Sequence, residues 1–587
     1  MPSERPLRQA IGDAGASMNS TRIRRAPARE TRHAAGPERP RLLTRVRRDA
    51  LRALAAGPLY RHTLIGRVPQ DLRLRLGQRW PGDPKRGTAL LNGEIEFAGE
   101  IVRNPEPVWF PPGAGPEWLM AWHGFGWLPD LSTIGGAARE AARALLKSWL
   151  NENIGWHPLV WRSDVLATRI FSWIVHFDEL AGRETDQELR RRMLVSLAAQ
   201  LRHLARTAAW ELSGAPRVRA LKGLVAGLVA LGASPKRVRR VVRALEREVP
   251  AQVLPDGGHR TRSPSTQLQV LRDLIDTRAA LRAARMEISH PLQNAIDRMA
   301  PMLRFFRHGD RRLALFNNSI EEDGVLVDLV LTRSETKGRA PAAAAHSGFQ
   351  RLQAGKSLII VDTGRPAARG FDDAAHAGTL SFELSQGRER IIVNCGAYRG
   401  PKPAWRRVAR ATAAHSVLVV DDTNSVEIND DGTLGRGPPT VRCERAEDNG
   451  DQWMSATHDG YRERFGLNYA RQFFLAADGD DLRGEDRLTG RAGAAFAIRF
   501  HLHPSVQAAL IRDATAVRLR LPSGAVWRLR AAGAELSLGE SIYLGSGELR
   551  KTQQVVLSGR VANGGTSVRW AIRREARAYA EDRAGEA

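Results

Sequence analysis

The period of the hydrophobic pattern changes once along this chain, near residue 315, and that change limits the folds it can adopt. Before it, apolar residues recur every three or four positions, at Ala138, Ala141, Ala142, Leu145, Leu146 and Trp149, and at Leu268, Leu271, Leu274 and Ile275. After it they alternate with polar residues, as Val517, Leu519 and Leu521 do with Arg518 and Arg520. The first spacing indicates amphipathic helices and the second indicates half-buried strands. Helices followed by strands predict an α+β multidomain fold.

The 587 residues are too many for one ordinary core, so we expect separate domains. Residues 1–45 are rich in Arg, Pro, Ala and Ser without apolar periodicity, which predicts a disordered basic arm. Residues 46–315 form the helical part, in which Gly and Pro separate the helices. Helix pairs with short connections build either a solenoid or an α/α toroid, and the pattern alone does not choose between them. Residues 316–587 form the β part.

Charge and cysteine content exclude some functions. The chain carries 89 Lys and Arg against 64 Asp and Glu, a net charge of +25 that attracts polyanions, although an Arg-rich coding bias explains it equally well. The arginines are spread out and lack a nucleic-acid-binding motif, so we expect no specific nucleic-acid partner. Cys395 and Cys443 allow at most one disulfide and no Cys-based zinc cluster. Neither a transmembrane segment nor a signal peptide is recognisable.

Several short motifs follow one another in a fixed order. The β part contains AHAGTLSFELSQGRERIIVNCGAY at 375–398 and RATAAHSVLVVDDTNS around His415. The others are WPGD at 80–83, WLMAWHGFGWLPDL at 118–131, WRSD at 161–164, LPDGGHRTRSP at 254–264, HDGY at 458–461 and GED at 484–486. Over about residues 80 to 500 this order resembles the heparinase II/III-like family of polysaccharide lyases.

The resemblance implies an N-terminal incomplete (α/α) toroid, followed by a C-terminal antiparallel β-sandwich, with an acidic polysaccharide in the cleft between them. The implied reaction is β-elimination, which needs donors on the uronate carboxylate, a base for the C5 proton and an acid for the leaving oxygen. In the family an Asn-His pair and a Tyr from the toroid, with a His from the sandwich, fill these roles. Here other residue types occupy the expected positions, namely Ala215, Pro216, Thr266, Gln267 and Ala374.

The remaining polar residues supply our candidate site. We expect His259, His376 and Tyr398 to be catalytic. The cations expected to bind a substrate carboxylate or sulfate are Arg260, Arg262 and Arg410, because a guanidinium can pair with either group through two hydrogen bonds. The resemblance also places His376, Asn394 and His415 where some members hold a structural metal, which predicts one zinc ion. The alternative is that both histidines only form hydrogen bonds inside the sandwich.

Other residues could fill the same roles. His501 and His503 lie two positions apart on an expected strand, which suits a metal pair, but a buried or interfacial pair is favoured because no third ligand is near in sequence. Tyr461 could shuttle a proton or simply pack. Six tryptophans could stack on sugar rings, although most should be core residues: Trp118, Trp122, Trp127, Trp156, Trp161 and Trp173.

Two functions follow from these residues. The leading hypothesis is a carbon-oxygen lyase that eliminates an acidic, uronate-containing polysaccharide in the interdomain cleft. The alternative is a non-catalytic glycan-binding or assembly protein on the same fold, motivated by the replaced catalytic positions. Nucleic-acid binding rests on net charge alone. The resemblance suggests a location in the periplasm or cell envelope, and the missing signal peptide suggests the cytoplasm instead.

Overall fold

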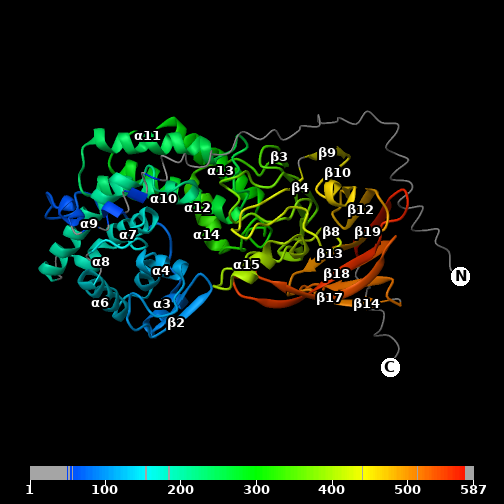
Figure 1. The fold of residues 1–587 in the computed structure, drawn as a ribbon, viewed down its shortest axis with the longest axis horizontal. Coiled ribbons are helices and arrows are strands. Elements are labelled where there is room, and N and C mark those ends of the chain that lie inside the picture. Colours follow the sequence, from blue (N-terminus) through cyan, green and yellow to red (C-terminus); the bar gives the residue numbers. More distant parts are fainter. Residues whose placement is uncertain are drawn as a thin grey trace, which may run out of the picture.

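The computed structural model describes residues 46, 49–50, 53–55, 57, 59–152, 155–182, 186–438, 440–511 and 513–575. Within these ranges a helical domain is followed by two antiparallel sheets, which confirms the expected α+β multidomain fold (Figure 1). The basic arm expected over 1–45 lies outside the described residues.

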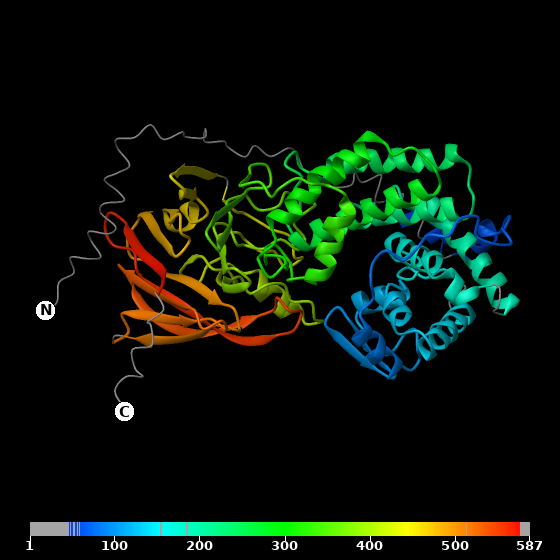
Figure 2. The ribbon, with the colours of Figure 1, turned by 180° about the vertical axis from the view of Figure 1, so that it is seen from behind.

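The helical domain is a double layer of helices. Its elements are η2 (Tyr60–Leu64), α3 (Pro84–Leu91), α4 (Pro116–His123), α5 (Leu128–Ile134), α6 (Ala137–Glu152), α7 (Ser163–Val175), α8 (Phe177–Ala181), α9 (Gln187–Thr207), α10 (Gly214–Ala230), α11 (Pro235–Gln252), α12 (Pro264–Ala283), α13 (His290–Phe305) and α14 (Gly324–Ser334). Helices α7, α10 and α12 pack side by side, and α9, α11 and α13 pack against them. The layers curve into an open arc (Figure 2).

Burial explains the two layers. Helix α10 buries almost every residue from Val218 onward, whereas α11 buries only a stripe of apolar residues and exposes a row of cations. An amphipathic helix can cover a core, and a helix that is apolar on all sides must lie inside one. Gly223 allows α10 to approach α7 closely, because a Cβ there would lie 2.5 Å from Cα of Ala167.

Two features of this domain were not expected from the sequence. A hairpin of β1 (Glu94–Phe97) and β2 (Glu100–Arg103) interrupts the helices. The helices also continue beyond residue 315, because α14 packs on α12 and α13 through Val327, Val330 and Leu331 before the first strand of the sandwich begins at Ala343. Four-residue strands and an eleven-residue helix are too short to change the hydrophobic period of a long window.

The C-terminal domain is an antiparallel β-sandwich. One sheet contains β3 (Ala343–Ala344), β4 (Phe349–Ala354), β5 (Ser357–Asp362), β6 (Phe382–Gln386), β7 (Glu389–Val393), β8 (Leu418–Val420), β13 (Ala495–Leu502), β17 (Glu535–Tyr543) and β18 (Arg550–Arg560). The other contains β9 (Val441–Asp448), β10 (Asp451–His458), β11 (Leu467–Leu475), β12 (Asp481–Gly490), β14 (Gln507–Ile511), β15 (Ala516–Arg520), β16 (Val526–Ala532) and β19 (Thr566–Arg574). Aromatic rings from both sheets meet in the core, with Phe382 stacked on Trp570 at 5.8 Å.

The two domains meet at two places. Strand β5 is buried along its whole length, because the second sheet covers one face and the helical domain covers the other. Phe349 on the neighbouring strand packs between Phe306 and Phe316 of the helical domain. The second contact joins the β1–β2 hairpin and α4 to α15 (Pro403–Arg410), where Arg406 pairs with Glu117 at 3.1 Å (Figure 2). A Cβ on Gly99 would lie 2.9 Å from Gly400 N.

Two further findings concern the described residues alone. No helix there is long and apolar enough to cross a membrane. Cys395 and Cys443 are both free thiols rather than a disulfide.

Candidate functional site

His376 and His415 form a hydrogen-bonded pair inside the sandwich. Nδ1 of His376 lies 3.1 Å from Nε2 of His415, and Nδ1 of His415 lies 2.8 Å from the carbonyl oxygen of Ala411. A carbonyl only accepts, so Nδ1 of His415 carries the hydrogen and its Nε2 accepts from His376. This leaves Nε2 of His376 as a buried lone pair with no hydrogen-bond partner in the described structure.

Burial keeps both rings neutral. It lowers the pKa of His415 to about 4, and burial together with the charges of nearby groups lowers that of His376 well below its ordinary value. A general base works best when its pKa lies near the operating pH. Both rings are more than nine-tenths buried, so this pair is poorly suited to collect a proton from a polymer.

The loop that carries His376 is fixed from three sides. Arg410 donates through Nε to the carbonyl oxygen of Ala375, at 2.7 Å, and the amide side chain of Asn317 accepts from the backbone N–H of His376 at 3.1 Å. Gly378 leaves room for the second ring, since a Cβ there would lie 2.7 Å from Cδ2 of His415. Arg410 is buried and holds this loop, while its expected contact with substrate stays a prediction.

The expected zinc site has two suitable ligands. Tetrahedral zinc with nitrogen ligands at about 2.1 Å would hold them roughly 3.4 Å apart, close to the observed 3.1 Å between His376 and His415. Asn394 does not complete the set, because its Oδ1 already accepts from Ser416 N at 3.0 Å and its Nδ2 is a donor. In the part of the chain that the structure describes, no group of three His, Cys, Asp or Glu could hold a metal. The donor set therefore fits zinc poorly, and a bound ion stays a prediction.

His259 lies in the loop before α12 and is fully enclosed. Its Nε2 contacts Gln252 Oε1 at 3.0 Å and its Nδ1 contacts Thr261 Oγ1 at 2.8 Å. Burial first, and the charge of Arg260 second, lower the pKa of His259 to about 3. The structure brings this loop close to the sandwich, where Phe371 contacts the His259 ring at 6.2 Å. Arg260 is half-buried, and its Nε has no partner among the described residues.

Arg262 bridges the two domains rather than facing solvent. Its guanidinium forms a buried ion pair with Asp362 at the end of β5 and donates to the carbonyl oxygens of Ser347 and Arg365, at 2.8 and 2.7 Å. Its backbone oxygen accepts from Asn317, which in turn holds His376. All of these bonds lie inside the protein, so Arg262 holds the two domains together. Its expected contact with a substrate stays a prediction.

The five replaced positions serve the fold. Ala215 and Pro216 lie in the first turn of α10, next to Gly214, whose carbonyl accepts from Gln252 at 2.7 Å. Gln267 is buried and accepts from His259 N at 2.7 Å. Thr266 donates its backbone N–H to the Ser263 hydroxyl that caps α12, and Ala374 is exposed. Hydrogen bonds link the loop before α12 to the start of α10 through Gln252 and to Gln267, but the side chains at the five positions lack the acid and base groups of an eliminase.

The other candidates form contacts of their own, and one of them, His501, lies next to His415. Tyr398 stacks on Trp405 of α15 at 6.1 Å, and Tyr461 is buried with its hydroxyl on the Leu418 carbonyl. His501 is buried between Ser541 and Ala413, and His503 packs on Tyr543, which fits the favoured prediction that these histidines are buried or interfacial. Within the described residues none of these rings contacts His376, and the catalytic role of Tyr398 stays a prediction.

The tryptophans divide into core and pocket residues. Four are buried in the helical core as expected: Trp118, Trp122, Trp127 and Trp173. Trp156 and Trp161 instead line a pocket of about 920 Å³ at the ends of α7 and α9, which we call the aromatic pocket. Its further walls include Tyr60, His203, Arg206, Trp210 and Glu211, residues that no sequence motif singles out. The one sequence feature that could have pointed to them is weak: Trp210 and Glu211 stand just before a helix.

Comparisons with known proteins agree with this architecture. The heparinase II/III-like C-terminal family model matches residues 336–571. FtsZ-localized protein C of Caulobacter vibrioides is 30% identical over 569 residues, covering 89% of this chain and 95% of that protein. The crystal structure of heparinase III superimposes with a TM-score of 0.65 at 13% identity, covering 90% of this chain and 91% of the other. Heparan sulfate lyase HepC from Pedobacter heparinus gives 0.55 at 16% identity, covering 90% and 88%.

Proposed function

This chain belongs to the heparinase II/III-like family, and from that premise we propose that it is a non-catalytic assembly protein, built on the lyase fold, that works at the site of cell division. One observation carries the first half of the proposal. Where a lyase of this family needs its acid and base groups, this chain has Ala215, Pro216 and Thr266, and its remaining histidines are buried and neutral.

The chemistry of elimination supports this proposal. Abstraction of a uronate C5 proton requires a base that reaches the sugar and a donor that neutralises the carboxylate. Three of the four ring nitrogens of His376 and His415 contact each other or the Ala411 carbonyl, and the fourth, Nε2 of His376, is buried. Arg262 spends its guanidinium on Asp362 and backbone oxygens. The two histidines and Arg262 can therefore stabilise the fold. A lyase fold by itself does not establish that the protein catalyses the lyase reaction.

The proposed role at the site of cell division is supported by similarity to another protein. FtsZ-localized protein C matches this chain along 95% of its own length, which includes both domains. Its name states where it is found, alongside FtsZ, and it states no reaction. A shared architecture at this identity supports a shared location more than a shared substrate with the lyases, whose identity to this chain is 13% and 16%.

We expect no lyase activity from the purified protein. Incubation with a panel of uronate-containing polysaccharides should release no unsaturated uronate, measured as ultraviolet absorbance, while an active heparinase III in parallel releases it. The runner-up function is elimination by a rebuilt site, which the retained fold and His376 favour. Product formation that disappears in a His376→Ala variant of unchanged fold would establish that alternative and overturn ours.

We also expect the protein to associate with FtsZ. It should sediment with FtsZ polymers formed with GTP and stay in the supernatant when GTP is replaced by GDP. A fluorescent fusion should form a band at midcell that disperses when FtsZ is depleted. A protein that stays in the supernatant with polymers, and is spread evenly through the cell, contradicts the division-site role.

A further inference from the structure

The aromatic pocket lies apart from the histidine pair and takes no part in the function argued above. Its walls come from the chain before η2, from the segment before α7 and from the end of α9. The apolar walls are formed by Leu54, Leu59, Tyr60, Trp156, Trp161 and Trp210. Leu54 and Leu59 are 66% and 75% exposed, and a large exposed apolar patch often marks a site of protein interaction.

One polar atom in the pocket wall lacks a partner. Trp161 is 5% exposed, and its indole N–H is buried without a hydrogen-bond acceptor in the described structure. A buried donor left unpaired is energetically costly. The nitrogen has almost no accessible surface, so a molecule in the pocket reaches this N–H only when the Trp161 ring turns toward it.

The other polar groups of the pocket are already engaged. The Tyr60 hydroxyl lies 2.7 Å from Nδ1 of His203, and Glu211 accepts from the backbone N–H of Ser163 at 3.0 Å. The indole N–H of Trp210 donates to the carbonyl oxygen of Arg206. A sugar ring presents several hydroxyl groups that each need a partner, and this pocket offers few. A bulky apolar side chain with one nearby carbonyl oxygen suits it better.

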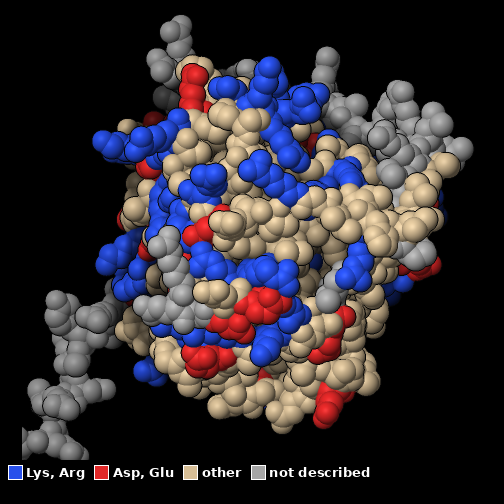
Figure 3. Space-filling view, turned by 90° about the vertical axis from the view of Figure 1, so that its left-hand side faces the viewer, with Lys and Arg blue, Asp and Glu red and all other residues tan. Residues whose placement is uncertain are grey.

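The rim of the pocket is basic. Arg206 lines the pocket, and Arg202 and Arg237 are close enough that their charges act on one another: after partial burial, the charges of Arg237 and Arg206 lower the pKa of Arg202. No carboxylate of the described residues pairs with Arg202, Arg206 or Arg237. The neighbouring helix α11 exposes further cations at Lys236, Arg239, Arg240, Arg243 and Arg247. Figure 3 shows many Lys and Arg side chains over this end of the molecule, with Asp and Glu side chains also visible, most of them in the lower half of the view.

We propose that the aromatic pocket docks a short acidic segment of a partner protein, which inserts an aromatic or large aliphatic side chain between the tryptophans. The Trp161 ring turns so that a backbone carbonyl of that segment accepts from its indole N–H, and the Asp and Glu side chains of the segment meet the arginines of the rim. Protein interfaces commonly have apolar anchor residues buried at their centre and polar or charged residues at their rim. This inference rests on the proposed assembly role, because it identifies the chemistry of a partner.

The test uses a display library of random short peptides, selected on the full-length protein. We expect the enriched peptides to combine acidic residues with one bulky apolar residue. A synthetic peptide of the enriched sequence should change the tryptophan fluorescence on binding. Trp156→Ala should weaken that peptide about tenfold, since it removes a wall of the pocket. Arg206→Ala should weaken it about threefold and flatten the salt dependence.

Two further variants separate docking from folding. Trp161→Phe keeps the ring and removes the unpaired donor, so its thermal stability should not fall, yet peptide affinity should drop about fivefold. Arg436→Ala, which removes an exposed cation of the sandwich that does not line the aromatic pocket, serves as the control and should bind normally. Enrichment without acidic residues, or affinity that Trp156→Ala and Trp161→Phe leave unchanged, overturns the proposal. A uronate oligosaccharide that displaces the peptide would overturn it too, and would assign the pocket to a glycan instead. None of these readouts uses FtsZ or a lyase substrate, so their failure is distinct from failure of the assembly role.

Discussion

Replacing Arg262 with Met should lower the free energy of unfolding by about 3–5 kcal/mol, because it leaves the buried carboxylate of Asp362 without its partner cation. Arg262 and Asp362 are 6% and 4% exposed as side chains, so water cannot solvate the carboxylate that remains. The guanidinium also satisfies three backbone oxygens, of Ser347, Gly348 and Arg365, which would lose their donor. Urea denaturation followed by tryptophan fluorescence measures the loss.

Two comparison variants make this prediction specific. Arg262→Met combined with Asp362→Leu should recover part of the stability, since removing both charges costs less than removing one. Arg282→Met breaks a surface pair with Glu335, whose side chains are 49% and 54% exposed, and should cost no more than about 1 kcal/mol. Equal losses of stability for Arg262→Met and Arg282→Met would show that the interdomain ion pair stabilises the protein no more than a surface pair does.

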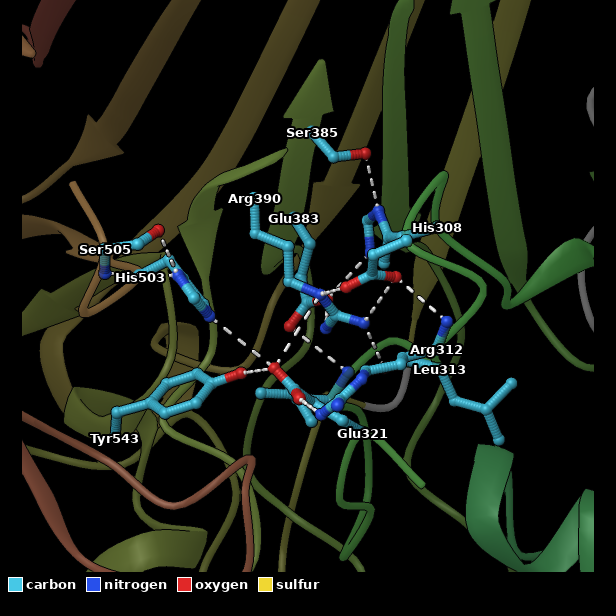
Figure 4. A network of polar contacts seen from close by, with 12 residues as sticks. His308, Arg312, Leu313, Glu321, Glu383, Ser385, Arg390, His503, Ser505 and Tyr543 are labelled. Atoms are coloured by element: carbon cyan, nitrogen blue, oxygen red, sulfur yellow. Dashed lines mark hydrogen bonds and ion pairs between the residues drawn. The ribbon is translucent and has the colours of Figure 1, made fainter. Parts of the chain in front are cut away.

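The second large effect concerns a buried ionic network at the domain junction (Figure 4). Arg390 of β7 donates to Asp310 at 2.8 Å and lies 3.9 Å from both Glu321 and Glu383. His308 contacts Glu383 at 3.0 Å, and Tyr543 donates to Glu321. These bonds tie the segment after α13 to strands β6, β7 and β17, so the network fixes how the helical domain sits on the sandwich.

Arg390→Met should therefore destabilise the protein by about 3–5 kcal/mol, because three acidic side chains lose their shared cation. The effect should depend on pH. Burial by itself would raise the pKa of Glu321, but hydrogen bonds from His503, Tyr543 and Arg312 and the charge of Arg390 hold it well below its ordinary value. A depressed folded-state pKa stabilises the fold above the unfolded pKa of about 4.5, and this stability is lost as the pH falls.

Unfolding measured from pH 7 down to about pH 3 should thus show a smaller acid-dependent loss for Arg390→Met than for the wild type. Arg436→Met is the matched control, since its pair with Glu463 is 72% and 76% exposed and should matter little. An Arg390→Met protein as stable as the control, with the wild-type acid dependence, would contradict the importance assigned to this network.

Local spacing was enough to predict several features. The period of three to four residues indicated the buried stripe of α6, including Ala138, Ala142 and Leu146, and the period of two indicated β15 and β16 with their hairpin. Ordered motifs pointed to the family and assigned His376 and His415 to one site, where the two rings are indeed paired. Each of these depends on residues close in sequence or on a pattern repeated within a family.

The sequence alone therefore determined the class of fold, the order of its domains and the residues absent from the catalytic positions. The tertiary structure decided what the polar residues do. The sequence suggested Arg262 as a substrate ligand, and the structure shows that its guanidinium pairs with Asp362, one hundred positions away. Tyr60 and His203 meet across 143 positions to form part of the aromatic pocket. The physical reason is that burial of a charge or a hydrogen-bond donor depends on long-range partners, which hydrophobic periodicity does not encode.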